Sequence, residues 1–202
     1  MGGGGGTGVG GGAPTFAITF SDSCPTLGTC GGNIDGGWTY QSACINKSNP
    51  WPVMKSVCSG VSFSDLSGTM SGTLDVSATH MTFNTELTIA AKMDLPAACL
   101  PSPPSQFSCA GVQLILLGTL TGTPLVKTAS CSVGADAGSC VCSVTDERKL
   151  PGTAASSYSG STLTTTGSDG GVRTYGYCVS GGTLTYQETS ATPLDSAIYT
   201  LK

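Results

Sequence analysis

The chain has 202 residues, only 10% of which are charged, and its formal net charge is -4. This length fits one domain, and so few charges exclude the basic stripe that binds nucleic acid by counterion release. Thirty glycines with few charged residues favour short strands and polar turns over long surface helices. No apolar run approaches the roughly 18 residues that a membrane-spanning helix needs.

The first twelve residues, MGGGGGTGVGGG, are mostly glycine. They carry too little apolar surface to offset the entropy lost on ordering. We therefore predict a flexible tether over residues 1–14 and a single disulfide-rich domain over residues 15–202. A phosphate-binding loop is excluded, because the stretch follows no strand and lacks the Lys-Ser/Thr ending of such loops.

Strand-like alternation begins at Gly36. One face of this predicted strand carries Trp38, Tyr40, Ser42 and Cys44, and the other carries Thr39, Gln41, Ala43 and Ile45. We expect the face that holds Trp38 to point inward.

A second alternating stretch, THMTFNTELTIAAKM, starts at Thr79. Its apolar face consists of Met81, Phe83, Leu87 and Ile89, and its polar face consists of His80, Thr82, Asn84, Glu86 and Thr88. The stretch Ser71–Ala78 before it, SGTLDVSA, predicts the partner strand of a hairpin.

The middle of the chain holds three segments of other kinds. The Pro-rich residues 100–108 predict a stiff loop that a disulfide can clip at its base. The apolar run of Ser108–Leu120 suits either a buried strand or a short helix, and we favour a short helix packed on the barrel. The charged run Asp146–Lys149 indicates a solvated strand end or a turn.

The C-terminal third repeats a rhythm of strand, turn and strand. Gly-rich turns separate the stretches STLTTTG, GVRTYGYCV and GTLTYQET, and the chain ends in SAIYTLK. Thr, Tyr and Val suit a pleated, half-buried surface, so each stretch predicts a strand.

Cysteines form an even set: Cys24, Cys30, Cys44, Cys58, Cys99, Cys109, Cys131, Cys140, Cys142 and Cys178. Such a set favours disulfides formed in an oxidising compartment. A zinc site is disfavoured, since no Cys-x-x-Cys pair occurs and the single histidine has no cysteine nearby. Proximity in sequence favours Cys44–Cys58 and Cys99–Cys109, with Cys131 bonded to Cys140 or Cys142 and the remaining cysteine of that pair bonded to Cys178.

Catalytic groups are hard to assemble from this sequence. The only histidine, His80, lies on the polar face of its strand, away from the interior in which a Ser/His/Asp triad would form. Asp146 and Glu147 are adjacent, so their side chains point to opposite faces and cannot act as a glycosidase pair. We expect no enzyme activity, no cofactor and no metal site.

The motif Gly36-Gly37-Trp38 opens the first predicted strand, CGGN precedes it, and CVC and the stretches YSGSTLTTTG and YGYCVSGGTLTYQ follow later in the chain. Together these short motifs resemble the lipocalin superfamily, and in particular lipocalin-like (calycin-type) domains of secreted bacterial lipoproteins. The resemblance spans about residues 30–202. It implies an all-β, antiparallel up-and-down meander closed into a lipocalin-like barrel of about 8 to 10 disulfide-stapled strands, with at most a short helix and with Trp38 across the closed end.

The resemblance implies non-catalytic binding of a small hydrophobic ligand. The candidate lining residues are Trp38, Tyr40, Met81, Phe83, Leu87, Ile89, Tyr175, Tyr177, Leu184 and Tyr186. A barrel of about eight strands has room either for side chains or for one small ligand, and a filled interior is the default for such a set. The alternative function is therefore a structural or protein-interaction module of the cell envelope with a solid core.

Oxidised cysteines require export, and because the chain lacks the charged and apolar regions of a signal peptide, we expect that such a peptide has been removed. The protein would reside at the bacterial outer membrane or cell surface as a lipoprotein, or be extracellular. Met1 would then occupy the place of a lipidated cysteine, which would anchor the tether. We expect a monomer that binds no nucleic acid.

Overall fold

The computed structural model describes residues 13–100, 108–118, 126–191, 193 and 196–202. The first twelve residues of the predicted tether and the Pro-rich loop from residue 101 to residue 107 lie outside the described residues. The elements are β1 (Phe16–Ala17), β2 (Thr19–Ser21), β3 (Gly36–Asn46), α1 (Pro52–Val57), β4 (Ser62–Val76), β5 (His80–Leu95), the 3-10 helix η1 (Ala97–Cys99), α2 (Cys109–Leu116), β6 (Thr128–Val133), β7 (Cys140–Ser159), β8 (Thr162–Thr166), β9 (Val172–Ser180), β10 (Thr183–Glu188) and β11 (Ile198–Leu201).

Eight strands form a closed hydrogen-bonded ring in the order β3-β4-β5-β7-β8-β9-β10-β11 and back to β3. Every neighbouring pair in the ring is antiparallel, and the order follows the chain except that β6 pairs with the first part of β7. The predicted all-β antiparallel meander is therefore confirmed. The ring is not a regular barrel, because β3 and β4 pair only over Gly36–Thr39 and Thr73–Val76.

The segment from β1 to β2 lies between β3 and β4. β1 pairs with β4, and β2 pairs in parallel with β3. Between these two short strands, Ile18 is buried and donates its backbone N–H to the carbonyl of Gly68 on β4. Gly68 suits this crowded position, since a Cβ there would lie 2.6 Å from the Thr88 carbonyl oxygen and 3.1 Å from Ile18 Cδ1.

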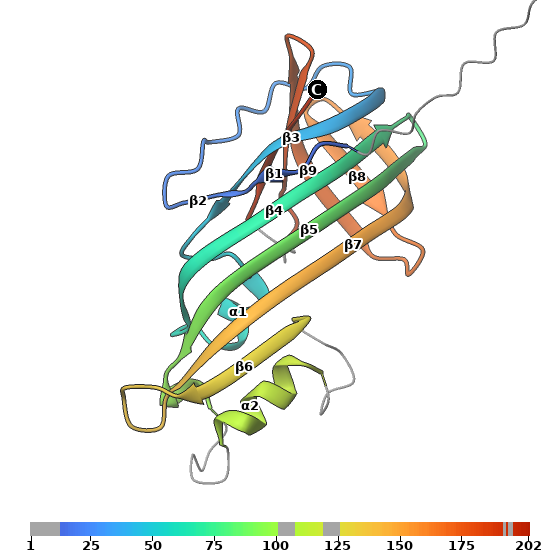
Figure 1. The fold of residues 1–202 in the computed structure, drawn as a ribbon. Coiled ribbons are helices and arrows are strands. Elements are labelled where there is room, and N and C mark those ends of the chain that lie inside the picture. The colour runs from blue at the N-terminus through green and yellow to red at the C-terminus, as the bar shows by residue number, and fades with distance from the viewer. Residues whose placement is uncertain (1–12, 101–107, 119–125, 192, 194–195) are drawn as a thin grey trace, which may run out of the picture.

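The longest strands, β4, β5 and β7, run beyond the ring towards α1, β6 and α2 (Figure 1). A second part of the core lies there. Trp51 precedes α1 and packs its indole ring 5.4 Å from the Phe63 ring of β4. Met93 of β5 and Val144 of β7 are buried in the same hydrophobic core. No helix among the described residues is long and apolar enough to span a bilayer.

The strand patterns are confirmed in β4 and β5 and fail in part in β3. The hairpin pairs Val76 with Met81, and side chains along β5 alternate between buried and exposed as predicted. In β3 the pairing with β11 skips Gln41, because Tyr40 opposes Leu201 and Ser42 opposes Thr200. This bulge reverses the alternation.

After the bulge, Ala43 and Ile45 are buried, whereas Ser42 is exposed and Cys44 is only half-buried. The prediction that Ser42 and Cys44 share the inward face of Trp38 was therefore wrong. A β-bulge inserts one residue against the partner strand and so shifts the side chains beyond it to the other face.

The predicted helix within Ser108–Leu120 is confirmed as α2. Ser108 caps it by accepting a hydrogen bond from the backbone N–H of Gly111, and the Gln113 side chain accepts one from the backbone N–H of Cys131 on β6. The prediction that Asp146–Lys149 forms a solvated end or a turn was wrong. This run lies within the 20-residue strand β7, with Asp146 buried.

All ten cysteines form disulfides, paired as Cys24–Cys44, Cys30–Cys178, Cys58–Cys99, Cys109–Cys140 and Cys131–Cys142. The predicted bond of Cys131 to one of its two candidates is confirmed. The predicted Cys44–Cys58 and Cys99–Cys109 bonds were wrong, as was the prediction that Cys140 or Cys142 bonds Cys178. Five disulfides indicate an oxidising, extracytoplasmic environment.

The wrong pairings have a topological cause. Cys58 and Cys99 lie 41 residues apart, one shortly before β4 and the other shortly after β5. In the antiparallel hairpin of β4 and β5, Asp94 pairs with Ser62, and this pairing brings the two cysteines together. Proximity in sequence carries no information about such a closure.

Candidate ligand-binding cavity

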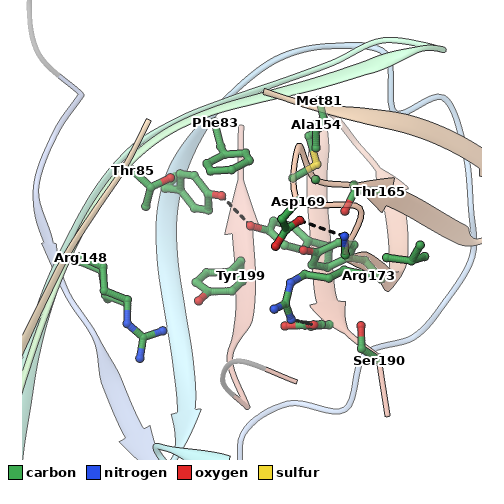
Figure 2. Close-up of a pocket in the computed structure, with 18 of the residues that line it drawn as sticks. Met81, Phe83, Thr85, Arg148, Ala154, Thr165, Asp169, Arg173, Ser190 and Tyr199 are labelled. Carbon is green, nitrogen blue, oxygen red and sulfur yellow. Dashed lines mark hydrogen bonds and ion pairs between the residues drawn. The ribbon is translucent and has the colours of Figure 1, made fainter. Parts of the chain in front are cut away.

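A cavity of about 320 Å³ lies inside the ring (Figure 2). Each of the eight ring strands contributes to its wall. One lining residue from each, in ring order, is Tyr40, Met70, Met81, Ala154, Thr165, Tyr175, Tyr186 and Tyr199. Ligand pockets in proteins typically measure about 300 to 1,000 Å³, so this cavity suits a small ligand.

Residues 30–36 lie across one end of the ring. The Cys30–Cys178 disulfide ties this segment to β9, and Gly31 exchanges backbone hydrogen bonds with Tyr177 and Val179. The Tyr177 hydroxyl donates towards the carbonyl oxygens of Gly32 and Gly160, at 3.3 and 3.1 Å. A tyrosine hydroxyl is protonated at neutral pH, and burial raises the pKa of Tyr177 further above its ordinary value.

The same segment is also bonded to β7 and β3. Tyr158 near the end of β7 donates its hydroxyl to Asp35 Oδ2 at 2.7 Å, and this hydrogen bond raises the pKa of Tyr158. The Trp38 indole donates Nε1–H to the carbonyl of Ile34 at 2.9 Å. Because Ile34 is fully buried, residues 30–36 act as a cover for this end of the ring.

The mouth of the cavity lies beside the turn between β8 and β9. Asp169, Gly171 and Val172 line the cavity and are exposed to solvent. Asp169 Oδ1 accepts a hydrogen bond from the backbone N–H of Gly171 at 2.9 Å, which braces the turn. A ligand entering here would pass one carboxylate and the side chain of Val172.

Four tyrosines form a cluster on the cavity wall. The Tyr186 ring stacks on Tyr199 at 5.1 Å and meets Tyr40 and Tyr175 edge-on. The hydroxyls of Tyr40 and Tyr186 share a hydrogen bond of 2.6 Å. Burial raises the pKa of Tyr186 well above its ordinary value, so its hydroxyl stays protonated even in alkaline solution in which an exposed tyrosine ionises. The wall therefore offers aromatic surface with polar hydroxyls at its edge.

Two arginines also line the cavity. Arg148 donates from Nε and Nη2 to Asp146 Oδ2, each at 2.7 Å, and Trp51 donates to the same oxygen. Arg173 donates from Nη1 to Glu188 Oε1 at 2.7 Å. Figure 2 shows the two arginines on either side of Tyr199. Each cation thus has a carboxylate partner held by a strand of the ring.

Six of the ten candidate lining residues border this cavity: Tyr40, Met81, Phe83, Leu87, Tyr175 and Tyr186. The other four lie elsewhere in the core. Ile89, Leu184 and Tyr177 are buried, and Trp38 is half-buried. Tyr177 faces the cover instead, which its hydrogen bonds to Gly32 and Gly160 explain.

Arg148, Arg173 and Glu188 form a polar part of the wall that was not predicted from the sequence. Arg173 lies two residues before Tyr175, and Glu188 lies two residues after Tyr186, so period-two alternation places each on the inward face of its strand. That signal was available. Tyr199 lies in a short final strand whose inward face only its pairing with β3 and β10 determines.

Within the described residues, no group of three His, Cys, Asp or Glu side chains is placed to hold a metal ion. Comparisons with protein-family models, with curated proteins and with solved structures find no match. Any functional assignment therefore has to come from the cavity itself.

Proposed function

We propose that this chain is a non-catalytic binding protein that holds a small, mainly apolar ligand inside the ring. The observation that carries the proposal is the cavity of about 320 Å³ to which all eight ring strands contribute. Its wall combines Met81, Phe83 and Leu87 with the tyrosine cluster. Apolar walls with a few placed polar groups are typical of small-molecule sites.

The proposal extends to the lipocalin-like character of the domain. Residues 30–36 cover one end of an antiparallel meander and the other end has a mouth, which supports a lipocalin-like arrangement. Five disulfides support export, and we propose that the Gly-rich residues 1–14 link the domain to a lipid anchor on a bacterial envelope. The alternative, an envelope module with a solid interior, receives less support because of the cavity.

A dye titration with a matched pair of variants tests the proposal. N-phenyl-1-naphthylamine is a neutral dye that fluoresces in apolar surroundings. Ala154 is buried and its side chain faces the cavity, whereas the neighbouring Ala155 is exposed on the outer face of β7. Ala154→Phe fills the cavity with a phenyl ring, and Ala155→Phe adds the same ring outside.

We expect the wild-type protein and Ala155→Phe to bind the dye with equal affinity, and Ala154→Phe to lose at least tenfold. The loss follows because the phenyl ring occupies the volume that the dye needs. Equal binding by all three proteins, or no binding by the wild type, would contradict the proposal.

A further inference from the structure

Arg173 faces the cavity from β9, close to the mouth (Figure 2). A guanidinium carries five N–H donors in a fixed planar fork. The ion pair with Glu188 uses Nη1, and nothing in the described part of the chain accepts a hydrogen bond from Nε or Nη2 of Arg173. One edge of the fork, Nε with Nη2, is therefore open to a ligand.

Arg148 differs in this respect. Its Nε and Nη2 both donate to Asp146 Oδ2, so the edge that is open in Arg173 is occupied in Arg148. The Arg148 side chain is also less exposed, at 24% against 36% for Arg173. Of the two cavity arginines, Arg173 is the one with a bidentate edge available for a ligand oxygen.

The carboxylates near Arg173 do not prevent it from binding a second anion besides Glu188. Glu188 has a side chain that is only 7% exposed and contacts the Nη1 side of the fork. Asp169 lies at the solvent-exposed mouth, where salt screens its repulsion of an incoming anion. Because a fork pairs bidentately with a carboxylate, one edge of Arg173 can bind Glu188 while the other binds an acidic group of the ligand.

We propose that the ligand is a planar aromatic acid. Its acidic oxygen group binds Nε and Nη2 of Arg173, and its ring packs against Tyr175, Tyr186 and Tyr199. Aromatic rings favour offset-stacked and edge-on contacts of the kind that these tyrosines already make with one another. This assignment rests on the proposed function, since it names the ligand class of the same cavity.

Two dyes with the same ring skeleton distinguish binding of an acidic group by Arg173 from binding of the rings in the cavity. N-phenyl-1-naphthylamine is neutral, and 8-anilinonaphthalene-1-sulfonate adds a sulfonate, which stands in for the ligand's acidic group. The affinities of both dyes are measured for the wild type, Arg173→Gln and Glu188→Gln. The neutral dye reports whether each variant retains an intact cavity.

For Arg173→Gln, we expect the affinity for the sulfonate dye to fall about tenfold while that for the neutral dye changes less than twofold. A hydrogen bond to a charged group is large enough for this change. For Glu188→Gln, which removes the competing carboxylate, we expect the affinity for the sulfonate dye to rise. If Arg173→Gln fails to fold, Glu188→Gln tests the proposal alone. The ratio of its affinity for the sulfonate dye to its affinity for the neutral dye should exceed that of the wild type.

The failures are distinguishable. If the wild type binds neither dye, the proposed function itself is wrong. If the wild type binds the neutral dye but the affinity ratio is the same in all folded variants, only the acid contact at Arg173 is wrong.

Discussion

The Cys30–Cys178 bridge should contribute more to stability than a bridge that closes a short loop. It joins residues separated by 148 positions, whereas Cys24–Cys44 spans 20. Loop-closure entropy predicts about 5 kcal/mol for the long loop and about 3 kcal/mol for the short one. The value of about 5 kcal/mol is an upper limit, because the other four bridges already shorten the unfolded chain between Cys30 and Cys178.

Local structure adds to the difference. The long bridge ties the cover, residues 30–36, to β9, and without it only hydrogen bonds would hold the cover: the backbone bonds of Gly31 and the side-chain bonds from Tyr177, Tyr158 and Trp38. Guanidinium unfolding of the two double variants, Cys30→Ala/Cys178→Ala and Cys24→Ala/Cys44→Ala, measures both losses without reductant. We expect the first variant to lose about 1 to 2 kcal/mol more than the second. An equal or larger loss in the second variant would refute the reasoning.

Two further predictions concern backbone space and pH. Gly72 and Gly36 have φ angles of 139° and 137°, but an added Cβ would lie 2.8 Å from Thr85 Cα at Gly72 and meet nothing at Gly36. Gly72→Ala should therefore lower the free energy of unfolding by about 1 to 3 kcal/mol more than Gly36→Ala, and equal losses in urea unfolding would show that β4 can shift away. The raised pKa of Tyr186 means that the folded state keeps a proton that the unfolded chain releases near pH 10, so this contribution to stability is full below about pH 10 and is lost as pH rises further. The free energy of unfolding should thus fall more steeply above about pH 10 for the wild type than for Tyr186→Phe, and parallel curves would contradict this.

The predictable parts of the fold are those with an uninterrupted local pattern. Along β5, the alternation of apolar and polar side chains from His80 onwards identified the inward face correctly, because no bulge interrupts its inward-facing residues. In β3 the same reasoning failed after Tyr40. The bulge at Gln41 arises from pairing with β11, which lies more than 150 residues along the chain.

The disulfide pairing and the burial of Asp146 also depend on contacts between residues far apart in the sequence, so local patterns could not predict them. A run of four charged residues reads as surface when taken alone. Asp146 is nevertheless buried, because Trp51 and Arg148 together satisfy its Oδ2. The Trp51 contact depends on how α1 packs beneath the long strands, which no local pattern specifies.

The apolar part of the candidate site followed from alternation, and the polar part required the ring. Met81 and Tyr186 were recognisable as inward residues from their strands alone. The ion pair of Arg173 with Glu188 depends on the register in which Glu188 opposes Tyr175 across β9 and β10. Sequence patterns supply the face of each residue, whereas pairing between strands supplies its partner.

Native mass spectrometry of the protein purified from its own source tests the central claim most directly. Wild type and Ala154→Phe are purified side by side under mild conditions, and the released molecules are analysed after denaturation. We predict that wild type carries one non-covalent small molecule of defined mass and that Ala154→Phe lacks it. The same molecule on both proteins, or none on the wild type, would contradict a ligand site inside the ring.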